Sequence, residues 1–145
     1  MGTRSTIALE FADGTVQQVY CHWDGYLSHN GEILRDHYSD PFKLAELISI
    51  GDLSSLAPSI DKPAGHSFDS PVDGHTVFYG RDRGESGCNA RKFKNLQDYF
   101  RNCQDEEYDY ILTRNTGWLV RCYATDGDWV ALGEMFEREA AEDAA

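Results

Sequence analysis

The residues with the widest chemical range lie between Tyr20 and Tyr26, in the stretch YCHWDGY. A cysteine beside a histidine makes a thiolate nucleophile when the imidazole reaches the sulfur atom. Cys21 and His22 are adjacent on an expected strand, however, so their side chains point to opposite faces. A nucleophilic site therefore needs a partner from elsewhere in the chain, and the candidates are His37, His66 and His75.

The same stretch admits two non-catalytic interpretations, and the sequence leaves both open. In the structural one, Cys21 and Trp23 point into the core, His22 and Asp24 point outwards or into a cleft, and Asp24 caps the next turn. In the other, aromatic rings stack on a planar ligand, while histidine and tyrosine provide directional hydrogen bonds. The candidate ligand-binding residues are then Tyr20, His22, Trp23, Asp24 and Tyr26.

A second cluster, FYGRDRGESGCNARKFK, gathers basic residues in a loop-rich part of an otherwise acidic chain. Arginine forks suit phosphate oxygens, and glycines let backbone N–H groups approach an anion. Tyr79, Arg81 and Arg83 are therefore further candidate ligand-binding residues. The cluster matches neither a P-loop nor a dinucleotide fingerprint. A solvated loop whose arginines pair with Asp82, Glu85 and the acidic tail explains the same pattern.

Acidic residues form the third pattern, since the formal net charge is -12. This charge makes non-specific contact with nucleic-acid phosphates unfavourable, so no direct nucleic-acid binding is expected. The acidic segments 105–109 and 134–143 are suited instead to a basic groove on a protein partner. Glu106 and Glu107 are neighbours in an expected loop, where nothing holds them at a reacting bond, so acid–base catalysis is not favoured.

The hydrophobic pattern predicts one α+β domain over residues 1–145, with the element order β-β-α-α-β-α-β-β-α. We expect a mainly antiparallel sheet of about five strands, made of two terminal hairpins and a central strand, covered by about four helices. Asp13-Gly14 suits the first hairpin turn, and Asp40-Pro41 suits a helix start. Residues 52–74 are expected to form a long loop, and the acidic end, 138–145, is expected to fray.

No metal, cofactor or membrane attachment is expected. The four cysteines, Cys21, Cys88, Cys103 and Cys122, are widely spaced and form no C-x-x-C pair, which favours reduced thiols in the cytoplasm. No apolar run approaches the roughly 20 residues of a membrane span, and the N-terminal residues lack the apolar region of a signal peptide. The sequence therefore predicts a cytoplasmic protein.

Five stretches resemble a recurrent, uncharacterised family of small phage and prophage proteins. They are TRSTIALE, DGTVQQVYCHWDGYLSHNGEIL, HYSDPFKLAELISIGDLSSL, VFYGRDRGE and YDYIL, and they span roughly Thr3 to Leu112. The resemblance implies a mobile genetic element and the cytoplasm of a bacterial host. It implies an accessory role, such as host takeover or anti-defence, and brings no catalytic residues with it.

Three functional hypotheses follow, of which the first leads. It is a non-catalytic anti-defence protein that sequesters a nucleotide-derived immune signal, with YCHWDGY stacking on the base and GRDRG holding phosphates. The alternative is an acidic, anti-CRISPR-like inhibitor that occupies the nucleic-acid groove of a bacterial defence protein. The third is a small nucleotide-processing enzyme that uses His22 and Asp24. A homo-oligomer with its site between subunits fits the same sequence.

Overall fold

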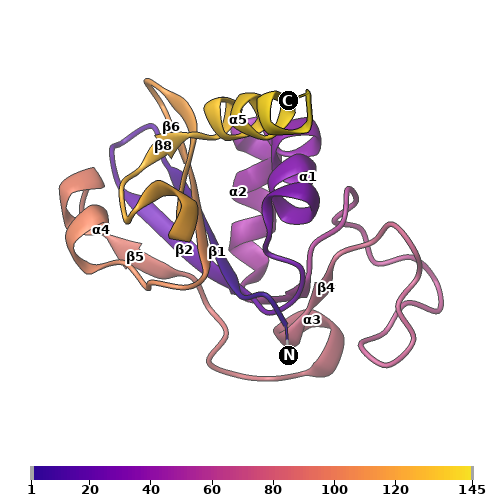
Figure 1. Ribbon diagram of the computed structural model, residues 1–145. Coiled ribbons are helices and arrows are strands. Elements are labelled where there is room, and N and C mark those ends of the chain that lie inside the picture. Colours follow the sequence, from indigo (N-terminus) through magenta and orange to yellow (C-terminus); the bar gives the residue numbers. More distant parts are fainter. Residues whose placement is uncertain (1, 145) are drawn as a thin grey trace.

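A single mixed β-sheet forms the centre of the computed structural model, which describes residues 2–144 (Figure 1). Over these residues the sheet has eight strands, in the order β4-β3-β2-β1-β6-β7-β8, with β5 paired to β2 outside this path. The strands are β1 Ser5–Glu10, β2 Val16–Cys21, β3 Leu53–Ser55, β4 Val77–Phe78, β5 Arg91–Phe93, β6 Tyr108–Thr113, β7 Gly117–Cys122 and β8 Val130–Ala131.

Both expected hairpins are present, as the antiparallel pairs β1–β2 and β6–β7. The expectation of a mainly antiparallel sheet of five strands is only partly right, because β1 pairs with β6, and β2 with β3, in parallel. The three additional strands, β3, β5 and β8, have only two or three residues each. A strand this short is too brief to show an alternating pattern in the sequence.

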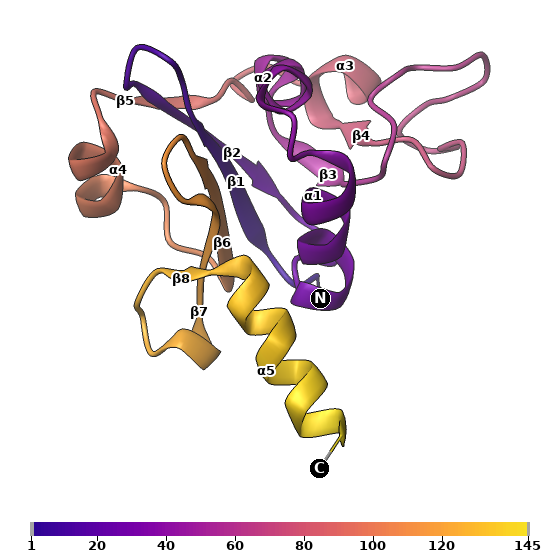
Figure 2. The ribbon, with the colours of Figure 1, turned by 90° about the horizontal axis from the view of Figure 1, so that it is seen from above.

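The helices lie on both faces of the sheet. They are α1 Glu32–His37, α2 Pro41–Ile50, α3 Tyr79–Arg83, α4 Leu96–Asn102 and α5 Leu132–Ala144. A π-helical turn, η1, spans Leu27–Gly31, and a 3-10 turn, η2, spans Tyr123–Thr125. Figure 2 shows α1 and α2 on one side of the sheet and α4 on the other. Helix α2 begins as expected, with the Asp40 carboxylate accepting a hydrogen bond from the Phe42 N–H.

Two hydrophobic clusters cover the two faces. The larger one includes Ile7 and Val19, packed with side chains of α1, α2 and α5. The smaller one includes Ala8 and Ile111, packed with Tyr99 of α4. Neighbouring residues Ile7 and Ala8 therefore serve opposite faces, as strand alternation requires.

The segment 52–74, expected to be one long loop, begins with the buried strand β3. The irregular part that follows extends away from the sheet in both views (Figures 1 and 2). At the other end, α5 continues through most of the segment 138–145 that was expected to fray, and its residues 137–143 are exposed. Within residues 2–144, no helix is both long and apolar enough to cross a membrane.

Candidate functional site

Two candidate residues, Tyr20 and Tyr79, lie on the sheet face opposite the larger core, near the end of β2. Three fully buried core residues oppose one another across β2, β3 and β4: Cys21, Leu53 and Phe78. Because side chains alternate along strands, the residues beside them, Tyr20, Asp52 and Tyr79, form a row on the other face. Hydrogen bonds hold this row together. The Tyr20 N–H donates to Asp52 Oδ1 at 2.8 Å, and the Tyr79 N–H donates to the Asp52 carbonyl at 3.2 Å.

Further aromatic rings extend the row at both ends. The Tyr20 hydroxyl lies 2.8 Å from His22 Nδ1, and the His22 and Trp23 rings meet edge to face at 4.7 Å between centroids. At the other end, the Tyr79 ring lies 5.6 Å from that of Phe68 in the long loop. We call these five residues, Tyr20, His22, Trp23, Phe68 and Tyr79, the aromatic face. Trp23 is 43% exposed and the other four side chains are half-buried, so the aromatic face reaches solvent mainly at Trp23.

Three arginines from distant parts of the chain flank the aromatic face. The Arg83 guanidinium lies over the Phe68 ring at 4.7 Å, and Arg91 Nη1 donates to Asp52 Oδ1 at 3.0 Å. Arg4 is close enough to act on the Tyr20 phenol: burial raises the pKa of Tyr20, and the charge of Arg4 partly opposes that rise. The sequence predicts Arg83 as a ligand-binding residue and includes Arg91 in the same basic cluster. Arg4 and Asp52 give no local signal, because strand pairing alone brings them here.

Arg81 does not join this group. Its guanidinium lies over the Phe78 ring, on the core side, at 4.6 Å. It donates from Nη1 to the Ile60 carbonyl at 2.6 Å, from Nη2 to the Thr76 carbonyl at 3.2 Å, and from Nε to Asp82 Oδ1 at 3.0 Å. Arg81 thus ties the long loop to α3, and a phosphate would have to compete with these partners.

Asp24 and Trp23 differ from the structural interpretation of the sequence. Trp23 is partly exposed rather than buried in the core. Asp24 has a φ of 58°, and its side chain does not cap η1, whose first turn has no side-chain cap. The next position needs glycine, because a Cβ on Gly25 would lie only 2.6 Å from the Ser5 Cβ. Tyr26, 37% exposed, lies near His29, with 6.1 Å between ring centroids.

The buried half of the same stretch is structural. Asn30 is fully buried and donates from Nδ2 to Ser5 Oγ at 3.2 Å and to Cys21 Sγ at 3.5 Å, which joins η1 to β1 and β2. Burial raises the pKa of the Cys21 thiol to about 11, so the thiolate is disfavoured. His22 bonds to Tyr20, and no hydrogen bond in the described chain joins it to Asp24. These contacts argue against both catalytic hypotheses.

The sequence also gives no sign of a buried polar network beneath β1, β2, β6 and β7. Thr6 Oγ1 donates to Asp109 Oδ1 at 2.6 Å, Arg121 Nη2 donates to Asp109 Oδ2 at 3.1 Å, and Gln18 Nε2 donates to Thr6 Oγ1 at 2.9 Å. Burial raises the pKa of Asp109 to about 6, although its bonds from Thr6 and Arg121 oppose the rise. This network joins four strands and favours a structural role.

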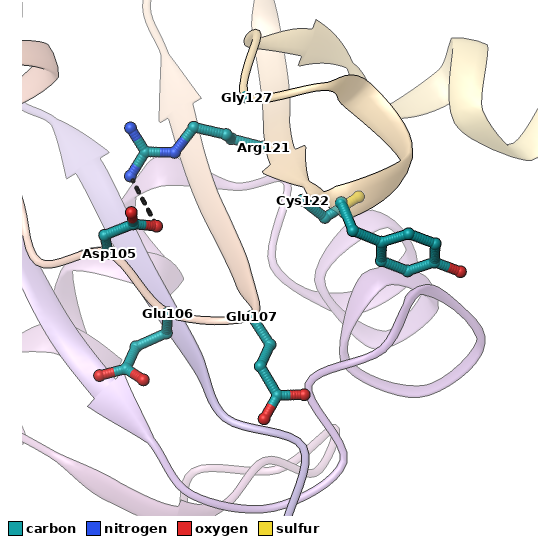
Figure 3. A pocket seen from close by; sticks show the side chains of 7 residues that line it. Asp105, Glu106, Glu107, Arg121, Cys122 and Gly127 are labelled. Atoms are coloured by element: carbon teal, nitrogen blue, oxygen red, sulfur yellow. Dashed lines mark hydrogen bonds and ion pairs between the residues drawn. The ribbon is translucent and has the colours of Figure 1, made fainter.

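An acidic hollow of about 410 Å³ opens beside Arg121. Figure 3 shows Arg121 and Asp105 pointing toward each other, whereas Glu106 and Glu107 point away from that pair. The other residues that line this acidic hollow are Cys122, Tyr123 and Gly127. Tyr123 is 81% exposed. An exposed aromatic ring beside several carboxylates is suited to contact with a positively charged partner.

Within residues 2–144, no group of three or more His, Cys, Asp and Glu side chains is arranged to hold a metal ion. No family model, curated protein or solved structure matches the chain. The resemblance to small phage proteins therefore stays a prediction. The fold and the aromatic face together describe an α+β protein with an open, arginine-flanked aromatic surface, and its function has to be argued from that surface.

Proposed function

We propose that the protein is a non-catalytic binding protein that sequesters a nucleotide-derived signal on its aromatic face. One observation carries the proposal: a partly exposed aromatic row lies among three arginines on a chain of net charge -12. Bases stack on aromatic rings whatever their sequence, and guanidinium groups suit phosphate oxygens. The combination matches both parts of a nucleotide.

In this proposal, different residues bind different parts of the ligand. Trp23 offers the most exposed ring of the aromatic face and is the stacking platform for a base. Among residues 2–144, Arg83 is held by the Phe68 ring and by a 4.0 Å ion pair with Glu85, so its guanidinium is available to a phosphate. Arg91 is a second phosphate partner, although its guanidinium already forms an ion pair with Asp52. Arg81 is omitted from this set because its donors hold the long loop.

The proposed setting is the cytoplasm of a bacterial host, and the proposed role is to counter a defence system that signals with nucleotides. The resemblance to small phage proteins supports this setting. Binding rather than turnover is favoured because the Cys21 thiol is fully buried and His22 is hydrogen-bonded to Tyr20. A sequestering protein needs only affinity for its ligand, which stacking and ion pairing supply without a nucleophile.

Titration calorimetry against cyclic dinucleotides and cyclic ADP-ribose isomers tests the proposal. We expect Trp23→Ala and Arg83→Ala each to weaken binding by about tenfold, since one base–aromatic stack contributes about 1–3 kcal/mol. The matched controls are Tyr123→Ala and Arg101→Ala, which remove an exposed ring and an exposed arginine elsewhere. The aromatic face would be ruled out as the site if none of these ligands bound the folded protein. It would also be ruled out if all four variants lost the same amount of affinity.

A second candidate function is an acidic inhibitor that binds the basic groove of a bacterial defence protein. The observation that favours it is the exposed Tyr123 beside the acidic hollow, together with the exposed carboxylates of α5. Such a complex should weaken as salt is added, because it depends on ion pairs between surfaces. Tyr123→Ala should weaken it and Trp23→Ala should not, which reverses the pattern expected for the nucleotide.

A further inference from the structure

An apolar groove lies at the end of the β1–β2 hairpin that is remote from the aromatic face. Two adjoining hollows, of about 220 and 280 Å³, share four lining residues: Leu9, Glu10, Pro41 and Arg114. The first hollow is completed by Leu112 and neighbours at the end of β6, and the second by Phe11, Phe42 and Ala45. We call the two hollows together the Pro41 groove.

Phe42 stands at the edge of this groove and is 85% exposed. The backbone that carries this ring is fixed, because the Phe42 N–H donates to the Asp40 carboxylate at 3.0 Å and Pro41 precedes it at the start of α2. A large apolar side chain held out into water beside an apolar groove is typical of an interaction surface.

We propose that the Pro41 groove is the interface at which two copies of this chain pair about a two-fold axis. Phe42 of each copy enters the first hollow of the other. A two-fold interface must be self-complementary, because the same patch meets itself. The Pro41 groove meets this condition: it carries a projecting ring, Phe42, directly beside a hollow that Phe42 does not itself line.

The charges of the groove also complement themselves. Glu10 and Arg114 line both hollows, and Glu10 Oε1 accepts a hydrogen bond from the Arg114 N–H at 2.8 Å. The Arg114 guanidinium makes no hydrogen bond or ion pair within residues 2–144. Two-fold pairing sets the guanidinium of one copy near the Glu10 carboxylate of the other. This balance of one positive and one negative group favours a second copy over a strongly charged partner.

The dimer has a salt dependence opposite to that of an acidic inhibitor bound to a basic protein. Each copy carries a formal charge of -12, so two copies repel at long range, while the groove itself is mostly apolar. Added salt screens both this repulsion and the Glu10–Arg114 pairs between the copies, but the repulsion involves far more charges and the apolar contact is left intact. The dimer should therefore strengthen with salt. The proposal does not depend on the proposed function, because the aromatic face lies at the other end of the hairpin and stays open in both copies.

Sedimentation velocity over a range of concentrations tests the dimer. We expect a concentration-dependent dimer that Phe42→Asp converts to monomer, with the dissociation constant raised by about tenfold or more, because the variant places a charge in an apolar contact. Tyr123→Asp removes an equally exposed aromatic ring elsewhere and is expected to leave the dimer intact. Circular dichroism confirms that each variant is folded.

Three results would overturn the proposal: a wild-type chain that stays monomeric at every concentration, a dimer that persists in Phe42→Asp, or equal dissociation of both variants. A dimer that weakens as salt is added would also overturn it, since ion pairs and not the apolar contact of Phe42 would then dominate the interface.

Discussion

The carboxyl group of Asp109 makes the stability of the protein depend on pH in a way that can be calculated. The side chain is fully buried, and burial raises its pKa from the ordinary 3.8 to about 6. The folded chain therefore keeps a proton on Asp109 over a pH range in which the unfolded chain has released it. The stability linked to this group is fully present below about pH 4 and is lost as the pH rises through about 6.

Asp109→Asn isolates this contribution, because the amide does not titrate. A difference of about two pKa units corresponds to about 3 kcal/mol. The free energy of unfolding of the wild type, minus that of Asp109→Asn, should fall by about this amount between pH 4 and pH 7. Urea unfolding at a series of pH values measures it without changing the ionic strength.

Asp105→Asn is the matched control, because Asp105 pairs with the same arginine, Arg121, but its side chain is 80% exposed. Its pH dependence should follow that of the wild type, since an exposed ion pair contributes little. The reasoning would be refuted if the free energy of unfolding of the wild type, minus that of Asp109→Asn, stayed constant or rose between pH 4 and pH 7. It would mean that Thr6 and Arg121 stabilise the carboxylate more than burial penalises it.

Four further predictions concern individual residues. Gly51→Ala should lower the free energy of unfolding by about 2 kcal/mol or more, because Gly51 has a φ of 112° and a Cβ there would collide with the Cys88 carbonyl oxygen. Gly14→Ala, at a φ of 89° in open space, should cost only about 1 kcal/mol by the same urea assay. Cys21, fully buried and with its pKa raised by burial, should react with a thiol reagent only on unfolding, whereas partly exposed Cys88 should react in the native state; early labelling of Cys21 would contradict its placement. Arg81→Ala should speed proteolysis of the segment between β3 and β4, and an unchanged cleavage rate would show that its bonds to Ile60 and Thr76 do not hold that segment.

The parts of the fold that the sequence predicts are those with a repeating or local signal. Ile7 and Leu9 alternate with polar or small residues and predict β1, and Asp40-Pro41 predicts the start of α2. The strands β3, β5 and β8 are missed because two or three residues carry no period. The parallel pairing of β1 with β6 is missed because it joins residues about a hundred positions apart, which no local pattern records.

The candidate site shows the same limit. Arg81 and Arg83 look equivalent in the sequence, yet one faces the core side and holds a loop while the other remains available at the surface. Trp23 is expected in the core under the structural interpretation but ends partly exposed, because β2 stops at Cys21 and strand alternation no longer applies. Arg4 and Arg91 reach the aromatic face only through the pairing of β1 and β5 with β2.

Native mass spectrometry tests the proposed function most directly. The protein is purified from bacteria with and without an active defence system that signals through nucleotides. The proposal predicts an added mass of nucleotide size only with the active system, and its loss in a variant that combines Trp23→Ala with Arg83→Ala. A ligand-free mass from both preparations of folded wild-type protein would contradict sequestration on the aromatic face.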